Sequence, residues 1–300
     1  MSPARRTLGR VSRPQSRASR PGDRPAAGPG LSPSRAADFQ QCPLLFRFRV
    51  IDRLPEAPSP SAVRGTLVHR VLELLFDAQA GARGLDAARS LLPTAWDELQ
   101  SRHPEYAELF ADPNELEPWL ARADELLTTY FTIEDPNRLE PAERELWVET
   151  VLPDGPALRG VIDRLDVAPD GAIRVVDYKT GKSPNPRYEA GALFQMRFYA
   201  VVLRRNRGEV PRMLQLVYLG DGRLIRHQPT GAELDATEQK IRAIWSSIER
   251  SALIGDWQPR TSKLCDWCAH QAVCPAFGGT PPELSAADVV RAIGVTPATG

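Results

Sequence analysis

Alternating apolar and polar positions are clearest between residues 160 and 182, where the sequence predicts two strands joined by a tight turn. Apolar side chains recur at every second position on each side of the turn, as the two-residue period of a strand requires. The loop Pro169-Asp170-Gly171 suits a three-residue hairpin, because glycine tolerates the positive φ needed at its last position. If the residues that flank this loop pair with each other, Asp163 lies directly opposite Asp177.

Two facing carboxylates on an apolar strand face indicate a bound cation. Such a pair is unfavourable unless a positive charge lies between the carboxylates, and a divalent metal that prefers hard oxygen ligands meets this need. Lys179 follows on the same face and is one of only four lysines among 38 basic residues. A compact ammonium kept there fits a task such as orienting a nucleophilic water. The structural alternative is a buried Asp–Lys ion pair on an ordinary hairpin.

Periodicity predicts further elements on both sides of this hairpin. The segment 84–140 is expected to be helical with breaks near Pro104, Pro113 and Pro136, and the helix from Gly65 carries a buried apolar stripe. The other predicted elements are a helix that begins at the cap Ser32-Pro33-Ser34, a strand over 145–151, a helix over 187–207, a second hairpin over 213–219 and 223–227, and a helix over 233–252.

Several polar side chains on these elements are candidates for the same site. His69 lies at the edge of the apolar stripe of its helix, where it is either a packed, hydrogen-bonded residue or a metal ligand. Gln195 and Tyr199 are one helical turn apart and share a face, so they either contact substrate or form a polar helix edge. The acids on the strand before the hairpin, Glu145 among them, are interpreted as its solvent-facing side.

Composition limits the classes of protein that remain. A chain of 300 residues at 42% hydrophobic can bury a full core, and no apolar run approaches the roughly 18 residues of a membrane span. We therefore expect a soluble, cytoplasmic protein with no membrane partner. Net charge is zero, but residues 1–30 carry seven arginines against one aspartate, a surplus of six that the remainder balances. This tail is expected to be disordered, and any nucleic-acid surface must be a local patch.

The four cysteines indicate a metal site rather than disulfides, since three of them cluster near the end of the chain. Cys265, Cys268 and Cys274 form that cluster, and Cys42 lies more than two hundred residues earlier. Four thiolates suit either structural zinc or a [4Fe–4S] cluster. The uneven three-plus-one spacing, with proline after both Cys42 and Cys274, favours iron–sulfur over zinc. Either cofactor would hold the start of the fold against its end.

Six motifs occur in order along the chain: Cys42, Gly65-x3-His69, Gly160-x2-Asp163, Asp177-x-Lys179, Gln195-x3-Tyr199 and Cys265-x2-Cys268-x5-Cys274. Together they resemble the RecB-type PD-(D/E)XK exonucleases with a cysteine cluster, a group that includes the AddB nuclease domain and the CRISPR-associated RecB-like exonucleases. The resemblance spans about residues 31–277. It is specific because all six motifs occur in the family's order.

The resemblance implies an α/β fold with a restriction-endonuclease-like core, in which helices flank a central mixed sheet, together with a helical insertion and a cysteine-ligated cluster. It implies a metal-dependent exonuclease that hydrolyses DNA at single-stranded ends in repair or recombination, with Mg²⁺ or Mn²⁺ as cofactor and a helicase or repair partner for any unwinding. By motif position it assigns metal ligation to His69, Asp163, Asp177 and the carbonyl of Tyr178, catalysis to Asp163, Asp177, Lys179, Gln195 and Tyr199, and [4Fe–4S] ligation to Cys42, Cys265, Cys268 and Cys274.

Three regions are expected: a disordered tail over 1–30, a nuclease domain over 31–277 and a C-terminal tail over 278–300. The helical stretch 84–140 shows no chemistry of its own and is interpreted as an insertion that flanks the site. The alternative function is a catalytically inactive protein of the same fold, which binds DNA or acts as a scaffold around an iron–sulfur or zinc cluster. Such a protein would still bind DNA after loss of Lys179 and would cleave none.

Overall fold

A five-stranded mixed sheet forms the centre of the computed structural model, which describes residues 28–110 and 112–297. The strands lie in the order β1 (Glu143–Val151), β2 (Ala157–Val167), β3 (Ile173–Lys179), β4 (Met213–Tyr218) and β5 (Arg223–His227). Neighbouring strands are antiparallel except β3 and β4, which are parallel. The expected α/β fold with a central mixed sheet is confirmed. The arginine-rich tail expected over 1–30 lies almost entirely outside the described residues.

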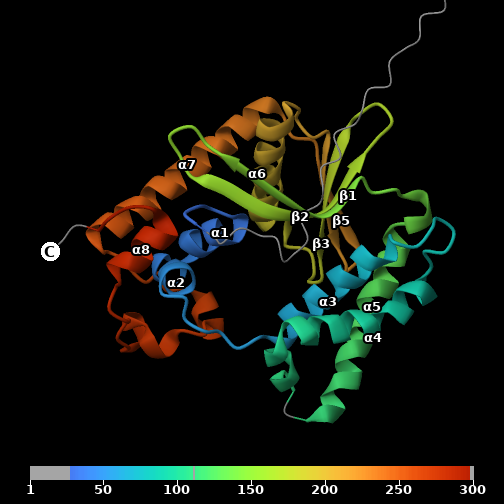
Figure 1. Cartoon of the computed structure of the whole chain (residues 1–300), viewed down its shortest axis with the longest axis horizontal. Coiled ribbons are helices and arrows are strands. Elements are labelled where there is room, and N and C mark those ends of the chain that lie inside the picture. Colours follow the sequence, from blue (N-terminus) through green and yellow to red (C-terminus); the bar gives the residue numbers. More distant parts are fainter. Residues whose placement is uncertain (1–27, 111, 298–300) are drawn as a thin grey trace, which may run out of the picture.

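Helices cover both faces of the sheet (Figure 1). One face packs against α6 and α7, and the other packs against α3, α4 and α5. Because parallel strands need a crossover connection, α6 links β3 to β4. The helices are α1 (Pro33–Gln41), α2 (Pro43–Phe46), α3 (Pro60–Leu75), α4 (Leu85–Arg102), α5 (Leu116–Ile133), α6 (Glu189–Arg207), α7 (Gly231–Ile254) and α8 (Ala286–Ile293).

The central hairpin has the predicted register. Leu165 pairs with Val175, and Val167 pairs with Ile173. Gly171 adopts a φ of 88°, the left-handed conformation that its position in the loop requires. The same register, continued beyond the last recorded pair, sets Asp163 opposite Asp177. Two neighbouring strands therefore bring acidic residues to one point of the sheet.

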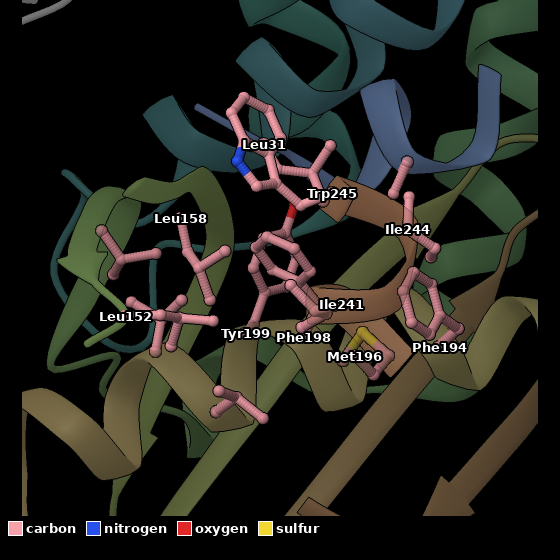
Figure 2. Packing of buried hydrophobic residues seen from close by; sticks show 14 of the residues in the cluster. Leu31, Leu152, Leu158, Phe194, Met196, Phe198, Tyr199, Ile241, Ile244 and Trp245 are labelled. Atoms are coloured by element: carbon pink, nitrogen blue, oxygen red, sulfur yellow. The ribbon is translucent and has the colours of Figure 1, made fainter. Parts of the chain in front are cut away.

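Apolar packing fixes α6 over this part of the sheet. Met196 and Phe198 of α6 are fully buried and pack with Ile241 and Trp245 of α7 (Figure 2). Burial of one such side chain contributes roughly 1.5–3 kcal/mol. The core thus holds the polar face of α6 toward the strand ends without help from the polar residues themselves.

A glycine allows α3 to approach the end of β3. The helix begins at the cap Ser59, whose side chain accepts a hydrogen bond from the N–H of Ala62 at 3.2 Å. A Cβ atom on Gly65 would lie 3.2 Å from Oγ1 of Thr180, which is closer than ordinary van der Waals contact. The glycine of the Gly65-x3-His69 motif therefore permits close contact, and His69 follows one turn later on the same helix.

The insertion has the predicted helical character. Helices α4 and α5 are separated and followed by short 3₁₀ turns that begin at Pro104, Pro113 and Pro136. Among the described residues, no helix has both the length and the apolar character required to cross a membrane.

The segment after the cysteines differs from the tail expected over 278–300. It contains α8, and Val289, Ala292 and Ile293 of this helix are buried in the main core. Its apolar residues recur at helical spacing and face the rest of the fold. Residues 286–293 therefore belong to the folded unit.

Candidate active site and cysteine cavity

Asp163 is held at the point where the recorded β2–β3 pairs end. The last of these pairs joins Arg164 to Val176. Just beyond it, Oδ2 of Asp163 accepts a hydrogen bond from the backbone N–H of Tyr178 at 2.7 Å. The carboxylate is thus tied to the backbone of the neighbouring strand and has little freedom to turn away.

The imidazole of His69 reaches the same point from α3. Its Nε2 donates to the backbone carbonyl of Tyr178 at 3.0 Å, and its Nδ1 lies 3.5 Å from Oδ2 of Asp163. Burial alone lowers the pKa of the His69 imidazole, but the carboxylates of Asp163 and Asp177 outweigh burial and raise the pKa to about 9. The two acids therefore create a strongly negative environment that favours a cation.

Glu145 completes a group of three potential metal ligands. One ligand atom each from His69, Glu145 and Asp163 lies within 4.8 Å of the other two. The β1–β2 register pairs Arg144 with Arg164 and Leu146 with Ile162, so Glu145 lies opposite Asp163. Its φ of 45° is unusual for a residue other than glycine, and such strained conformations cluster at functional sites.

The interpretation of the β1 acids as a solvent-facing side is therefore wrong for Glu145. Alternation along the strand gave no reason to assign Glu145 a different role from the other glutamates of β1. The register of β1 against β2 distinguishes it, and that register depends on contacts between strands. An acid on the strand before Asp163 was the only signal that the sequence carried.

Asp177 and Lys179 form a closed hydrogen-bonded network with two residues of α6. Asp177 is 3% exposed, and its Oδ2 lies 2.7 Å from Nζ of Lys179. The amide of Gln195 bridges the pair, since its Oε1 accepts from Nζ of Lys179 at 2.9 Å and its Nε2 donates to Oδ1 of Asp177 at 2.8 Å. Burial and the Asp163 carboxylate raise the pKa of Asp177 to about 6, although Lys179 opposes the shift.

Tyr199 extends this network, and a glycine makes room for its ring. The hydroxyl of Tyr199 accepts a 3.3 Å hydrogen bond from Nε2 of Gln195. A Cβ atom on Gly160 would lie only 2.6 Å from Cε1 of the Tyr199 ring, so any other residue at position 160 would displace the ring. The glycine of the Gly160-x2-Asp163 motif is therefore a steric requirement of the site.

A buried ion pair behind the sheet supports the site from the insertion. Arg164 is 1% exposed, and its Nη1 lies 2.8 Å from Oε2 of Glu134, just beyond the end of α5. The Nε of Arg164 also lies 3.1 Å from Oδ1 of Asp166, and Nη1 donates to the hydroxyl of Tyr178. The expectation that residues 84–140 contribute no chemistry is thus too narrow, because Glu134 neutralises the residue next to Asp163.

The predicted site residues lie together at one edge of the hairpin, in two adjoining sets. His69 and Asp163 are joined by Glu145 and lie beside the carbonyl of Tyr178. The carboxylate of Asp177 belongs instead to the network with Lys179, Gln195 and Tyr199. Carboxylate oxygens with one imidazole suit Mg²⁺ or Mn²⁺, so the first set has a chemically suitable group of ligands for a divalent metal.

All four cysteines line one cavity between the start and the end of the fold, and none of them forms a disulfide. Apolar side chains such as Leu44 and Phe48 supply much of the remaining lining. Two backbone N–H groups donate to sulfur, from Arg260 to Cys42 and from Ser262 to Cys265, each at 3.3 Å. Figure 1 shows this C-terminal segment beside α2, so the cavity lies where the start and the end of the fold meet.

The fold and the grouped acids are those of an α/β protein able to hold a divalent cation beside a lysine. The family profile described as "PD-(D/E)XK nuclease superfamily" matches residues 30–275 of this chain. The chain therefore belongs to the PD-(D/E)XK nuclease superfamily, and it is a nuclease. Nucleases of this superfamily use divalent metals.

Three relatives share part of the sequence. The "Gene 69 protein" of Mycobacterium phage D29 is 24% identical over 278 residues, which cover 83% of this chain and 97% of that protein. The protein of the same description from phage L5 is 31% identical over 128 residues, which cover 41% of each chain. A subunit of the ATP-dependent helicase/deoxyribonuclease of Streptococcus mutans is 27% identical over 197 residues, which cover 63% of this chain and only 18% of that relative.

A solved structure has a similar fold. The crystal structure of a protein from Eubacterium rectale, described as a candidate exonuclease, matches with a TM-score of 0.55 at 16% sequence identity. The match covers 80% of this chain and 87% of that one. At this identity the likeness concerns the fold alone.

Proposed function

We propose that this chain is a divalent-metal-dependent exonuclease that hydrolyses phosphodiester bonds at single-stranded DNA ends, in repair or recombination. The observation that carries the proposal is the group of His69, Glu145 and Asp163, whose ligand atoms lie within 4.8 Å of one another. The streptococcal relative supports DNA as the substrate, because its description joins a helicase to a deoxyribonuclease. The same relative supports a helicase partner that would supply any unwinding.

The donor set suits the proposed metal, which His69, Glu145 and Asp163 would hold with the carbonyl of Tyr178 nearby. A bound Mg²⁺ or Mn²⁺ would lower the pKa of a water ligand and neutralise charge on the scissile phosphate. Lys179, whose ammonium is held by a hydrogen bond to Gln195 and an ion pair with Asp177, would orient the attacking water and stabilise negative charge on the phosphate.

Asp177 would serve both sets of residues. Its buried carboxylate fixes the ammonium of Lys179 at 2.7 Å and accepts from Gln195 at 2.8 Å. Burial and the Asp163 charge raise its pKa, and the strand register sets the two carboxylates opposite each other, so a cation at this point would stabilise both. Removal of this carboxylate would release the lysine and weaken the metal site together.

The test is degradation of end-labelled single-stranded DNA with Mn²⁺. The wild-type protein is expected to shorten the labelled DNA progressively. Asp177→Ala is expected to cleave at a rate at least about 1,000-fold lower, which is the order of loss found when a preorganised charge-stabilising group is removed. Asp170→Ala, which changes an exposed acid in the hairpin turn, serves as the matched control. Equal rates for wild type and Asp177→Ala would refute the assignment. DNA binding without turnover under any metal would favour an inactive scaffold.

We propose further that the four cysteines ligate a [4Fe–4S] cluster. The uneven three-plus-one spacing of the cysteines along the chain and the apolar lining of their common cavity support this cluster over structural zinc. Iron and sulfide analysis after anaerobic purification tests this, and stoichiometric zinc without iron would overturn it.

A further inference from the structure

Tyr178 links two of the proposed metal ligands to the helical insertion. Its backbone N–H donates to Oδ2 of Asp163 at 2.7 Å, and its carbonyl accepts from Nε2 of His69 at 3.0 Å. Its side chain is buried in the apolar cluster that the helices α3, α4 and α5 form against the sheet. A shift of this one residue would therefore move Asp163 and His69 together.

A buried guanidinium holds the far end of the Tyr178 side chain. Nη1 of Arg164 donates to the hydroxyl of Tyr178, and the guanidinium carbon lies 5.6 Å from the centre of the phenol ring. Arg164 is 1% exposed, so water does not compete for these contacts. Hydrogen bonds from a charged donor are stronger than those between neutral groups. Tyr178 is therefore held at its hydroxyl as well as at its backbone.

Glu134, the first residue after α5, fixes the direction of this guanidinium. Its carboxylate accepts from Nη1 of Arg164 at 2.8 Å and from Nη2 at 3.1 Å. A bidentate pair of this kind determines orientation as well as distance. The same carboxylate accepts from Nε2 of Gln215, a buried side chain of β4, at 2.9 Å. The insertion thus reaches the metal ligands through consecutive hydrogen bonds from Glu134 to Arg164 and on to Tyr178.

The end of β3 needs such an anchor on the side of β2. The recorded β2–β3 pairs of the described chain end at Arg164 and Val176, before they reach Tyr178. On the other side, Tyr178 pairs with Val217 of β4, which keeps the strand in the sheet. The side chain of Tyr178 therefore decides how the strand end lies relative to β2. A displacement of about 1 Å at a catalytic group can lower the rate on the order of 100-fold.

We propose that Arg164 and Glu134 are positioning residues for the metal site. Acting through the hydroxyl of Tyr178, they hold Asp163 and His69 at the spacing that a divalent cation needs. The proposal rests on the proposed metal-dependent function and adds to it residues that lie outside the ligand set. Groups that orient metal ligands typically contribute about 10–100-fold to metal affinity. Glu134 would give the insertion a part in metal binding as well as in stability.

The first experiment measures Mn²⁺ binding by electron paramagnetic resonance, which detects free Mn²⁺ and requires neither DNA nor turnover. Tyr178→Phe removes the hydroxyl but keeps the backbone N–H and carbonyl, and it is expected to raise the Kd for Mn²⁺ about tenfold. Tyr130→Phe is the matched control, because its ring packs 5.8 Å from that of Tyr178 but its backbone belongs to α5. This control is expected to bind Mn²⁺ as wild type does.

Three results would contradict this expectation. An unchanged Kd in Tyr178→Phe would refute the positioning role, and so would an equal rise in both tyrosine variants. A wild-type protein that binds no Mn²⁺ would instead refute the proposed metal-dependent function.

A second pair of variants separates positioning from stability. Glu134→Gln and Asp166→Asn each remove one carboxylate partner of Arg164, at Nη1 and at Nε respectively, so both should lower the free energy of unfolding. Nη1 is also the atom that donates to Tyr178. Only Glu134→Gln is therefore expected to raise the Kd for Mn²⁺, by about tenfold. Equal Mn²⁺ affinities in these two variants would overturn the proposal.

Discussion

The catalytic group and the cysteine cavity are built by opposite means. The catalytic side chains lie on β1, β2, β3, α3 and α6, and hydrogen bonds of 2.7–3.0 Å fix several of them to one another or to the backbone of Tyr178. Cys42 lies between α1 and α2, and Cys265 lies in a 3₁₀ turn of five residues. Cys268 and Cys274 flank short 3₁₀ turns as cap residues. Trp267, which lies between two of these cysteines, is 87% exposed.

This difference indicates how far the geometry of each site depends on a bound metal. Sheet register and helix packing determine the geometry of the catalytic group whether or not a cation is bound. Short turns with exposed side chains bury too little apolar surface to define a geometry alone, so we expect the cysteine segment to depend on bonds to the proposed cofactor. We therefore expect loss of a cysteine ligand to affect folding and loss of a catalytic ligand to affect chemistry.

The largest effect is expected from Cys268→Ser. Loss of one thiolate should remove the cluster, and structural metals contribute on the order of 10 kcal/mol to the folding of small domains. We expect loss of iron and a fall of at least about 10 °C in Tm, measured by circular dichroism with iron analysis. Asp266→Ser in the same turn should retain iron and Tm. A Cys268→Ser variant of unchanged Tm would remove the contrast between the two sites.

The ion pair behind the catalytic strands should produce the next largest effect. Glu134→Gln leaves the charge of the buried Arg164 only partly neutralised, which is expected to lower the free energy of unfolding by about 3 kcal/mol in urea titrations. Glu140→Gln is the matched control, because the Glu140 side chain is 76% exposed in its contact with Arg83 and should change stability by less than about 1 kcal/mol. Similar losses in both variants would show that burial of Arg164 is irrelevant.

Glu145→Gln tests one proposed metal ligand within the catalytic group. The change keeps the size of the side chain but removes a charged ligand, so the Mn²⁺ concentration for half-maximal rate should rise up to about 100-fold, or roughly 2.7 kcal/mol. Iron content and Tm should stay as in wild type. Glu149→Gln, an exposed residue of the same strand that pairs with Arg159 and not with Asp163, should leave the Mn²⁺ requirement unchanged. An unaltered Mn²⁺ requirement in Glu145→Gln would remove this residue from the ligand set.

The smallest effect is expected where the cysteine segment touches the chain that leads to α3. His270 is 4% exposed, and its Nε2 lies 2.7 Å from Oε1 of Glu56. His270→Ala removes this hydrogen bond to a charged group and should lower the free energy of unfolding by about 1.5–3 kcal/mol, with faster loss of iron in a chelator. The Mn²⁺ requirement should not change. A shifted Mn²⁺ requirement would show that the two sites are coupled.

Local patterns predicted most of the elements that carry the site. The hairpin and its register followed from alternation and one turn glycine, and the structure confirms the pairing of Leu165 with Val175. Helical periodicity also located α3 with His69 and α6 with Gln195. These features depend on residues within a few positions of one another, which is why a single sequence contains them.

Such local patterns could not predict contacts between distant segments. The sequence does not distinguish Glu145 from the other glutamates of β1, and only the β1–β2 register places it opposite Asp163. Glu134 lies in an insertion without motifs, yet it neutralises Arg164. Helix α8 needs a core built by residues far from it in the chain. Each of these depends on long-range packing, which periodicity does not encode.

The sequence by itself determined the hairpin, the order of the motifs and the chemical types of the site residues, because strand and helix periods and turn glycines act over short distances. Long-range packing decided which acid joins His69 and Asp163 and which charge neutralises Arg164, whereas the meeting of the four cysteines in one cavity was already indicated by their number and spacing. Those choices depend on how the sheet aligns its strands and which helices close over each face, and these are set by burial of the whole core.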